Sequence, residues 1–454
     1  MIKYEDLPRT FSEKLPKSNA LLERANEVLV SFVTTGPYRA PANVAFVKRA
    51  QGSRVWDIDD NEYLDVTMGY GPLILGHAHP VAVEAAQRAV ADGTTYAIAH
   101  EHEVHLAELM VDAIPCADKI LFCNSGTEAT MYAIRIARAT SGKDKVATFE
   151  MGWHGPHDYG LVGSMLSAGA GPAEAPLAST DCAGVSDRVL SESIKLAFDC
   201  DQSLQRIRDM KDEIAVVIIE PMPSGYPLEM QAFLEKLRAV TRECGVLLMF
   251  DEVVTGFRCA YGGAQEKFGV VPDLAAFGKA MGGGMPVGAV AGTEQAMSSI
   301  VSSGDAAQDA LERKVVAIGT FSGNPVTTRV GAAVVEHLRD NPSIYKDMDA
   351  LTAQVKTELN AFAKTKEIPF ELLGDNSWFM PFMGDKPFKH ARDGHDENHV
   401  MRNIILCNYL RYMGIYFPDM HTGFFSASHS QADADLFVSK TKSALLDMRA
   451  QGLL

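Results

Sequence analysis

Short apolar runs alternate with amphipathic segments between about residue 115 and residue 290, and this alternation constrains the fold more than any other feature. Four of the runs have the length of strands: KILFCN (119–124), KVATF (145–149), IAVVIIE (214–220) and VLLMFDEV (246–253). Between the last two, apolar residues recur at helical spacing before a glycine that suits a helix end: Phe233, Leu234, Leu237, Val240 and Gly245. The pattern predicts an α/β fold around a mostly parallel sheet.

The two flanks of this region have a different pattern and predict a second domain. A chain of 454 residues exceeds the usual size of one hydrophobic core. Residues 1–70 contain VWDIDDNEYLDV, which is typical of a hairpin, and residues 326–454 contain helices joined by polar turns. We expect a large domain over 71–325 and a smaller α+β domain built from 1–70 and 326–454.

Composition excludes several classes of function. The net charge is −16 and there is no cluster of Lys and Arg, which argues against nucleic acid as a partner. The seven cysteines form no C-x-x-C pair, so we expect reduced thiols and a cytoplasmic protein rather than disulfides or zinc. Neither a signal peptide nor an apolar run of about 20 residues is present, and we expect no membrane partner.

In open α/β sheets ligands bind where parallel strands end, so the residues after each apolar run are the informative ones. Ser125, Gly126 and Thr127 follow the first run and open a helix, where free amide groups can bind a phosphate. Asp251 follows the run VLLMF, and Lys279 stands between the apolar stretch LAAF and three glycines. Structural interpretations stay open here: helix capping by Ser125 or Thr127, an ion pair between Asp251 and Lys279, and a lysine that reaches solvent along its own stem.

One cofactor accounts for all of these residues together. Pyridoxal 5′-phosphate (PLP) has an aldehyde that condenses with a lysine, a pyridine nitrogen that a carboxylate keeps protonated, and a phosphate that suits a helix N-terminus. Trp153 follows the strand 145–149 and can stack on the flat ring, although it could also be a core aromatic. His154 and His157, in the sequence HGPH, do not indicate a metal site, and no dinucleotide fingerprint is present.

Seven motifs, in one order along most of the chain, resemble the class III, fold-type I, PLP-dependent aminotransferases, in particular the branch of glutamate-1-semialdehyde aminomutase. Each motif is weak alone, but their joint order is specific. They are VWDIDDNEYLD with GHAHP (76–80), NSGTEA (124–129), WHG (153–155), IIEPM (218–222), FDEVVTGFR (250–258), GKAMGGGMPVGA (278–289) and GTFSGNP (319–325).

This resemblance implies roles at matching positions. Lys279 would form the Schiff base with PLP, and Asp251 would bind the pyridinium. Val253 would pack on the ring face opposite Trp153. The phosphate would be bound by Ser125, Gly126 and Thr127, and by Thr320 of a neighbouring subunit, so the resemblance implies a homodimer with shared active sites.

On the substrate side the resemblance is less complete. Arg39 matches an arginine that binds a substrate carboxylate, and Tyr70 and His421 are expected near the substrate. His421 stands where the aminomutase branch carries a glutamate that handles the second amino group of its substrate. An imidazole that is neutral near pH 7 replaces a carboxylate there, which weakens the aminomutase interpretation.

We therefore expect an aminotransferase. It would move an amino group from a carboxylate-bearing primary amine, an amino acid with β-amino acids among the candidates, to a 2-oxo acid by a ping-pong mechanism. The alternative is glutamate-1-semialdehyde 2,1-aminomutase, which transfers the group within one molecule. A racemase or epimerase, and a non-catalytic protein that keeps the fold for binding or assembly, stay open at this point.

Overall fold

The structure is a computed structural model that describes residues 2–30, 44–165, 169–180, 182–226 and 230–454. The chain divides into two compact units. The central unit comprises Pro80–Tyr345 and His390–Arg392, and the flanking unit comprises Met1–His79, Lys346–Lys389 and Asp393–Leu454. The domain boundaries predicted from the sequence remain a prediction.

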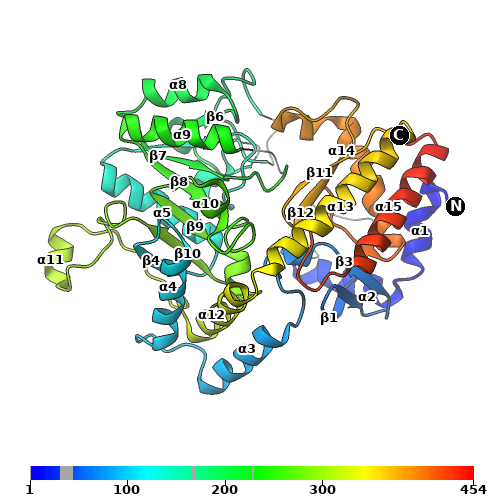
Figure 1. The fold of residues 1–454 in the computed structure, drawn as a ribbon, viewed down its shortest axis with the longest axis horizontal. Coiled ribbons are helices and arrows are strands. Elements are labelled where there is room, and N and C mark those ends of the chain that lie inside the picture. The colour runs from blue at the N-terminus through cyan, green and yellow to red at the C-terminus, as the bar shows by residue number, and fades with distance from the viewer. Residues whose placement is uncertain (1, 31–43, 166–168, 181, 227–229) are drawn as a thin grey trace. The chain divides into compact units, whose positions relative to one another are not determined.

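A sheet of seven strands forms the middle of the central unit within the described residues (Figure 1). Five neighbouring strands run parallel, and β10 runs antiparallel to both of its neighbours. In spatial order the strands are β4 (Lys119–Cys123), β10 (Gly288–Gly292), β9 (Leu274–Phe277), β8 (Leu247–Asp251), β7 (Ile214–Ile219), β5 (Lys145–Phe149) and β6 (Ser193–Leu196). The expected α/β fold with a mostly parallel sheet is confirmed.

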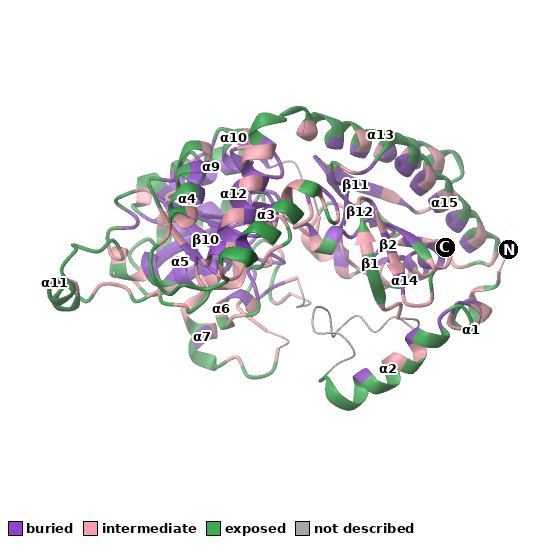
Figure 2. Ribbon diagram, turned by 90° about the horizontal axis from the view of Figure 1, so that it is seen from below, coloured by how far each residue is buried: buried purple, intermediate pink, exposed green. Residues whose placement is uncertain are grey.

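The sheet is buried on both faces, which explains why its strands are continuous apolar runs rather than alternating ones. All six residues of β7 are buried, and Figure 2 shows the buried strands between helices whose outer faces are exposed. The helices of this unit are α3 (Pro80–Asp92), α4 (Glu101–Ala113), α5 (Gly126–Ser141), α6 (Asp158–Leu161), α7 (Asp187–Glu192), α8 (Asp201–Asp209), α9 (Gln231–Cys244), α10 (Gly263–Phe268), the 3-10 helix η3 (Lys279–Gly282), α11 (Ala306–Leu311) and α12 (Pro325–Asp340).

The local expectations hold closely in this unit. The four apolar runs are β4, β5, β7 and β8. Helix α9 ends before Gly245, whose φ of 61° is in the left-handed region that a C′ glycine adopts at little cost. Strand β8 ends at Asp251 rather than at 253, because the carboxylate of Asp251 accepts the backbone amide of Val253, two residues later, at 3.1 Å.

The flanking unit is an α+β structure with its own core. Arg54–Asp57 and Glu62–Asp65 form the expected hairpin. Two small sheets contain β1 (Val47–Gln51), β2 (Arg54–Asp57), β3 (Glu62–Asp65) and β13 (Ile415–Tyr416), and β11 (Glu371–Asp375), β12 (Trp378–Phe382) and β14 (Gly423–Phe424). Its helices are η1 (Tyr4–Asp6), α1 (Leu7–Ser12), α2 (Pro16–Val28), η2 (Met68–Tyr70), most of α13 (Ser343–Thr365), the last three residues of η4 (Ala391–His395), α14 (Glu397–Tyr412) and α15 (Gln431–Ala450). No helix in the described part of the chain has both the length and the apolar character of a membrane span.

Candidate active site

A cavity of about 190 Å³ opens in the central unit where β8 and β9 end and α5 begins. It brings together most of the residues that the sequence predicts for a cofactor site, although they come from five separate segments. Its lining consists of Gly126, Thr127, Thr130, Trp153, His154, Gly155, Glu220, Asp251, Val253, Val254 and Lys279.

Asp251 is buried at the end of β8, and a histidine is its partner. The ring nitrogen Nδ1 of His154 lies 2.7 Å from Asp251 Oδ2, and both side chains are 3% exposed. The ion pair between Asp251 and Lys279 that the sequence left open is therefore not what holds Asp251 in place.

Glu252, the next residue, serves a different purpose. Its carboxylate accepts the amide of Ala264 at 2.6 Å, the amide nitrogen of the Gln265 side chain at 3.0 Å and the hydroxyl of Thr255 at 3.0 Å. Burial raises the pKa of Glu252 to about 7, and these three donors oppose the increase. The two adjacent carboxylates thus separate into one that lines the cavity and one that holds the start of α10.

Lys279 begins η3 directly after β9, with a backbone that is unusual for its type. Its φ is 44°, a left-handed conformation that costs a side-chain-bearing residue about 1–3 kcal/mol and that is found mainly at functional sites. Removal from water lowers the pKa of the Lys279 amine to about 8, while Glu220 and Asp251 act in the opposite direction and Arg258 lowers it further. A substantial neutral fraction near neutral pH makes this amine a nucleophile for an aldehyde.

The start of α5 has the form of an anion site. The hydroxyl of Ser125 caps the helix by accepting the amide of Glu128 at 3.1 Å. The amide groups of Gly126 and Thr127 precede it in the first turn, where amides have no acceptor within the helix. A Cβ at Gly126 would lie 2.7 Å from both methyl carbons of Val253, so only glycine allows this close approach. Capping and phosphate binding are therefore compatible at this turn.

The turn that carries Trp153 is fixed by a second buried carboxylate. The amide of Trp153 donates to Glu220 Oε2 at 3.2 Å. Burial raises the pKa of Glu220, and the neighbouring charge of Asp251 adds to the effect while His154 opposes it. Trp153 is only partly buried and lines the cavity, as does Val253.

Other predicted residues lie elsewhere. Thr320 is an exposed turn residue and does not line this cavity. Tyr70 and His421 both belong to the flanking unit, where their ring centres are 4.6 Å apart. Arg39 lies outside the described residues.

Sequence reasoning missed five residues of this cavity: Thr130, His154, Gly155, Glu220 and Val254. Glu220 could have been found, because it follows the apolar run of β7 in the same way as Asp251 follows that of β8. His154 stands in the motif WHG, which assigns it no role of its own, and in HGPH, which does not indicate a metal site. Thr130 carries no signal in the sequence, since it fits the small-residue pattern of α5.

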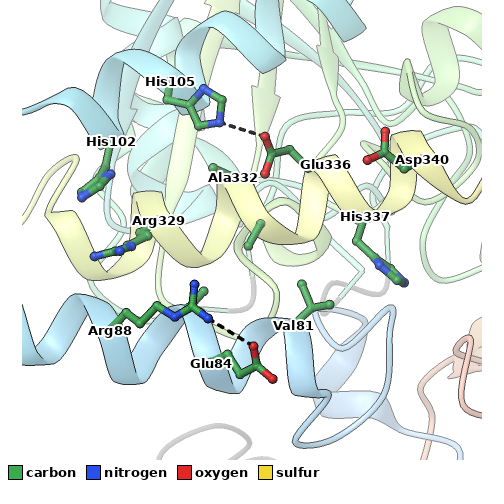
Figure 3. A pocket seen from close by; sticks show the side chains of 12 residues that line it. Val81, Glu84, Arg88, His102, His105, Arg329, Ala332, Glu336, His337 and Asp340 are labelled. Carbon is green, nitrogen blue, oxygen red and sulfur yellow. Dashed lines mark hydrogen bonds and ion pairs between the residues drawn. The ribbon is translucent and has the colours of Figure 1, made fainter.

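A larger cavity of about 480 Å³ lies between α3, α4 and α12, but its chemistry is less suitable (Figure 3). Two pairs form within its lining, Arg88 with Glu84 at 3.6 Å and His105 with Glu336 at 3.0 Å, and Arg329 pairs with Asp92 outside it. Its lining contains no amine, thiol or hydroxyl that could act as a nucleophile. In the described part of the chain, no three His, Cys, Asp or Glu side chains converge to hold a metal ion.

The residues of the smaller cavity fit PLP. Lys279 is an amine of lowered pKa, Asp251 is a held carboxylate, Gly126 and Thr127 offer free amides, and Trp153 offers a ring face. Gly155 allows its turn to lie close to Thr127, since a Cβ at this position would lie 2.5 Å from the hydroxyl oxygen of Thr127.

Comparison with known proteins gives the same assignment. The profile of the family described as class-III aminotransferases matches residues 37–374. A glutamate-1-semialdehyde 2,1-aminomutase from Methanosphaera stadtmanae is 37% identical over 442 residues, which are 95% of this chain and 99% of that protein. An omega-transaminase from Sphaerobacter thermophilus is 33% identical, with a TM-score of 0.87 over 95% of this chain and 97% of the other. A β-phenylalanine aminotransferase from Variovorax paradoxus is 25% identical, with a TM-score of 0.85 over 98% and 97%.

These findings confirm the resemblance seen in the motifs, including its aminomutase-like branch, and identify the cofactor as PLP. Solved structures with the same fold contain PLP or its amine form, pyridoxamine phosphate. The chain belongs to the class-III aminotransferase family and is an enzyme with the PLP-dependent fold of type I.

Proposed function

We propose that this enzyme is an aminotransferase that moves an amino group from a carboxylate-bearing primary amine to a 2-oxo acid in two half-reactions. The observation that carries the amino-transfer chemistry is the convergence of Lys279 with the pair formed by Asp251 and His154 on one cavity. PLP, when bound, supplies the aldehyde that takes up the amino group and the ring that withdraws electrons from the substrate carbon.

The chain's own residues then have the following roles. Lys279 would hold the cofactor through Nζ, and as a free amine the same atom would move a proton to or from the substrate carbon. Asp251 would bind the ring nitrogen and hold its proton, while His154 Nδ1, 2.7 Å from Asp251 Oδ2, keeps the carboxylate oriented. Trp153 and Val253 would confine the two faces of the ring.

The phosphate contacts are part of the same proposal. Gly126 and Thr127 bind the phosphate through the free amides of the first turn of α5. Ser125 shapes that turn through its cap to Glu128 at 3.1 Å.

Transfer between two molecules, rather than within one, is supported by His421. An imidazole at this position offers no carboxylate to a second ammonium group on the substrate. The omega-transaminase and the β-phenylalanine aminotransferase are consistent with a single-amine donor, and the latter with a β-amino acid. In this proposal Arg39 binds the donor carboxylate through its planar fork, and Tyr70 and His421 are the other proposed substrate contacts.

A homodimer is also proposed. Exposed hydrophobic side chains gather on two segments, with Val90, Ile98 and Val104 on one and Ile318 and Phe321 on the other. His100 Nε2 lies 2.8 Å from the carbonyl oxygen of Gly323, so these segments are neighbours. A second copy would cover this apolar surface. Thr320 belongs to the same surface, and a residue that contacts the phosphate in the second copy has to lie there. The cytoplasmic location predicted from the sequence is in keeping with seven free thiols.

The second candidate is glutamate-1-semialdehyde 2,1-aminomutase, and the names of the curated relatives favour it over the first. Aminomutases between 33% and 38% identical match most of the chain. The decisive difference is the acceptor, because the isomerase needs none.

The test supplies the purified PLP-loaded enzyme with glutamate 1-semialdehyde, or with a panel of α- and β-amino acids, with and without pyruvate or 2-oxoglutarate. Product formation that requires the 2-oxo acid and shows parallel lines in double-reciprocal plots supports the aminotransferase. Turnover of the semialdehyde without any acceptor supports the aminomutase. Racemisation of an amino acid without an acceptor would contradict both.

A further inference from the structure

Thr130 is a fully buried residue on α5 whose hydroxyl lies within hydrogen-bond distance of two different segments. On its own helix, Oγ1 is 3.2 Å from the carbonyl oxygen of Gly126 and 3.0 Å from that of Thr127. Across the cavity wall it is 2.7 Å from the carbonyl oxygen of His154 and 3.1 Å from Nε2 of His157. The residue therefore touches both the phosphate turn and the turn that carries Trp153.

The directions of these bonds follow from the histidine. Nδ1 of His157 accepts the amide of Gly160 at 3.3 Å, so in the neutral ring the proton is on Nε2 and is donated to Thr130 Oγ1. Burial, with His154 as a further cause, lowers the pKa of His157 to about 4, which keeps the ring neutral near pH 7. The single hydroxyl proton of Thr130 is then available to a carbonyl oxygen. The nearest carbonyl oxygen is that of the His154 backbone, at 2.7 Å.

Thr130 thus joins two segments that would contact opposite ends of the proposed cofactor. The amides of Gly126 and Thr127 belong to the phosphate end. Trp153 and His154 belong to the ring end, where His154 also orients Asp251. The other polar contacts of this turn, to Glu220 and to Asp251, come from strand ends and not from α5.

We propose that Thr130 is a positioning residue that holds the phosphate-binding turn and the ring-binding turn at the spacing of one PLP molecule. The inference rests on the proposed cofactor site. The competing explanation is a helical threonine that bonds back to its own helix, as buried threonines often do. That explanation predicts a loss of stability without any preference between ligands.

The test compares PLP with pyridoxal, which has the ring and aldehyde but no phosphate, in cofactor-free protein. Binding is followed by absorbance of the bound ligand and by fluorescence quenching, with Kd measured for both. In the wild-type protein the phosphate strengthens binding because both ends are engaged at once. Thr130→Val keeps the shape and removes the hydroxyl, so we expect a PLP Kd about tenfold higher, with a much smaller change for pyridoxal.

Matched variants separate positioning from folding. Thr140→Val is the control, since Thr140 is on the same helix and its hydroxyl donates to the carbonyl oxygen of Ala296 at 3.0 Å, away from the cavity. It should leave both Kd values unchanged, and Thr130→Ser, which keeps the hydroxyl, should restore PLP binding to within about threefold.

His157→Asn gives an independent measurement if Thr130→Val does not fold. Asparagine can still cap α6 but no longer reaches Thr130, so the preference for PLP over pyridoxal should fall in the same direction.

Two results would overturn the inference. Equal loss of PLP and pyridoxal in Thr130→Val, with an unchanged ratio of the two Kd values, means that the role of Thr130 is structural only. Failure of the wild-type protein and of Thr140→Val to bind PLP at all would overturn the cofactor site itself, and the inference with it.

Discussion

Replacing Glu220 with glutamine is expected to lower the pH at which the amine of Lys279 loses its proton. Glu220 has the largest effect on Lys279 of all its charged neighbours, and its negative charge raises the pKa of that amine. The amide oxygen of glutamine can still accept the Trp153 amide, which lies 3.2 Å from Glu220 Oε2. The substitution therefore removes the charge while it keeps the hydrogen bond.

The size of the effect in the wild-type protein follows from the lowered pKa. With a pKa of about 8, roughly one Lys279 amine in ten is neutral at pH 7. An ordinary lysine, with a pKa of 10.5, is neutral in only about one molecule in three thousand at that pH. Since the neutral amine attacks the aldehyde, Lys279 should capture PLP about 300-fold faster than an unperturbed lysine of equal intrinsic reactivity. Glu220→Gln should be faster still at pH 7.

The assay mixes cofactor-free protein with PLP in a stopped-flow instrument and follows the change in visible absorbance from about pH 6 to about pH 10. The midpoint of the rate profile should lie near pH 8 in the wild type and at lower pH in Glu220→Gln. Glu128→Gln is the control, because the Glu128 carboxylate accepts the Asn124 amide at 2.8 Å and is not among the groups that influence Lys279. A wild-type midpoint near that of free lysine, or a midpoint in Glu220→Gln that does not fall, would refute this reasoning.

Three further substitutions test other parts of the account. Gly126→Ala places a Cβ 2.7 Å from both methyl carbons of Val253. Overpacking of this kind costs about 1–3 kcal/mol, so the Kd for PLP should rise about 5- to 150-fold. Adding Val253→Ala to the same chain should recover most of this loss of affinity. Lys195→Met leaves the carbonyl oxygens of Phe149 and Val162 without the buried donor that lies 3.1 and 2.9 Å away, and should cost about 2–4 kcal/mol in urea unfolding near pH 8. Burial lowers the pKa of Lys195 to about 7, so between about pH 7 and pH 10.5 the unfolded chain binds more protons at this residue than the folded chain does. The free energy of unfolding of the wild type should therefore gain a contribution that rises with pH in this window, and Lys195→Met should lack that contribution. His421→Glu restores a carboxylate and should increase turnover of glutamate 1-semialdehyde without an acceptor; no change would argue against a role for this position in choosing between the two reactions.

Strands β4, β5, β7 and β8 were predictable because each is a largely apolar run between turn signals. The order of the strands was not, since β10 pairs on one side with β9, the preceding strand in the chain, and on the other with β4, which is distant in sequence. No local pattern encodes such pairings, which depend on how whole segments pack.

The candidate site was predictable where chemistry and position coincide. Asp251 and Lys279 are charged residues directly after apolar strands, where an unpartnered charge is costly, and this marked both of them. His154 and Thr130 act through contacts between separate segments. The hydroxyl of Thr130 and the carbonyl oxygen of His154 are 2.7 Å apart, although the two residues are 24 positions apart in the sequence. Their residue types are common in loops and helices, so only the folded arrangement reveals their contacts.

Treatment of the PLP-loaded enzyme with borohydride, followed by peptide mass spectrometry, tests the central claim most directly. The account predicts loss of the visible band and one modified lysine, Lys279, even though Lys195 is also buried with a lowered pKa. Lys195 donates to Thr148, Phe149 and Val162 and does not line the cavity. A label on Lys195, or a label spread over surface lysines in a protein that still transfers amino groups, would contradict the assignment of Lys279.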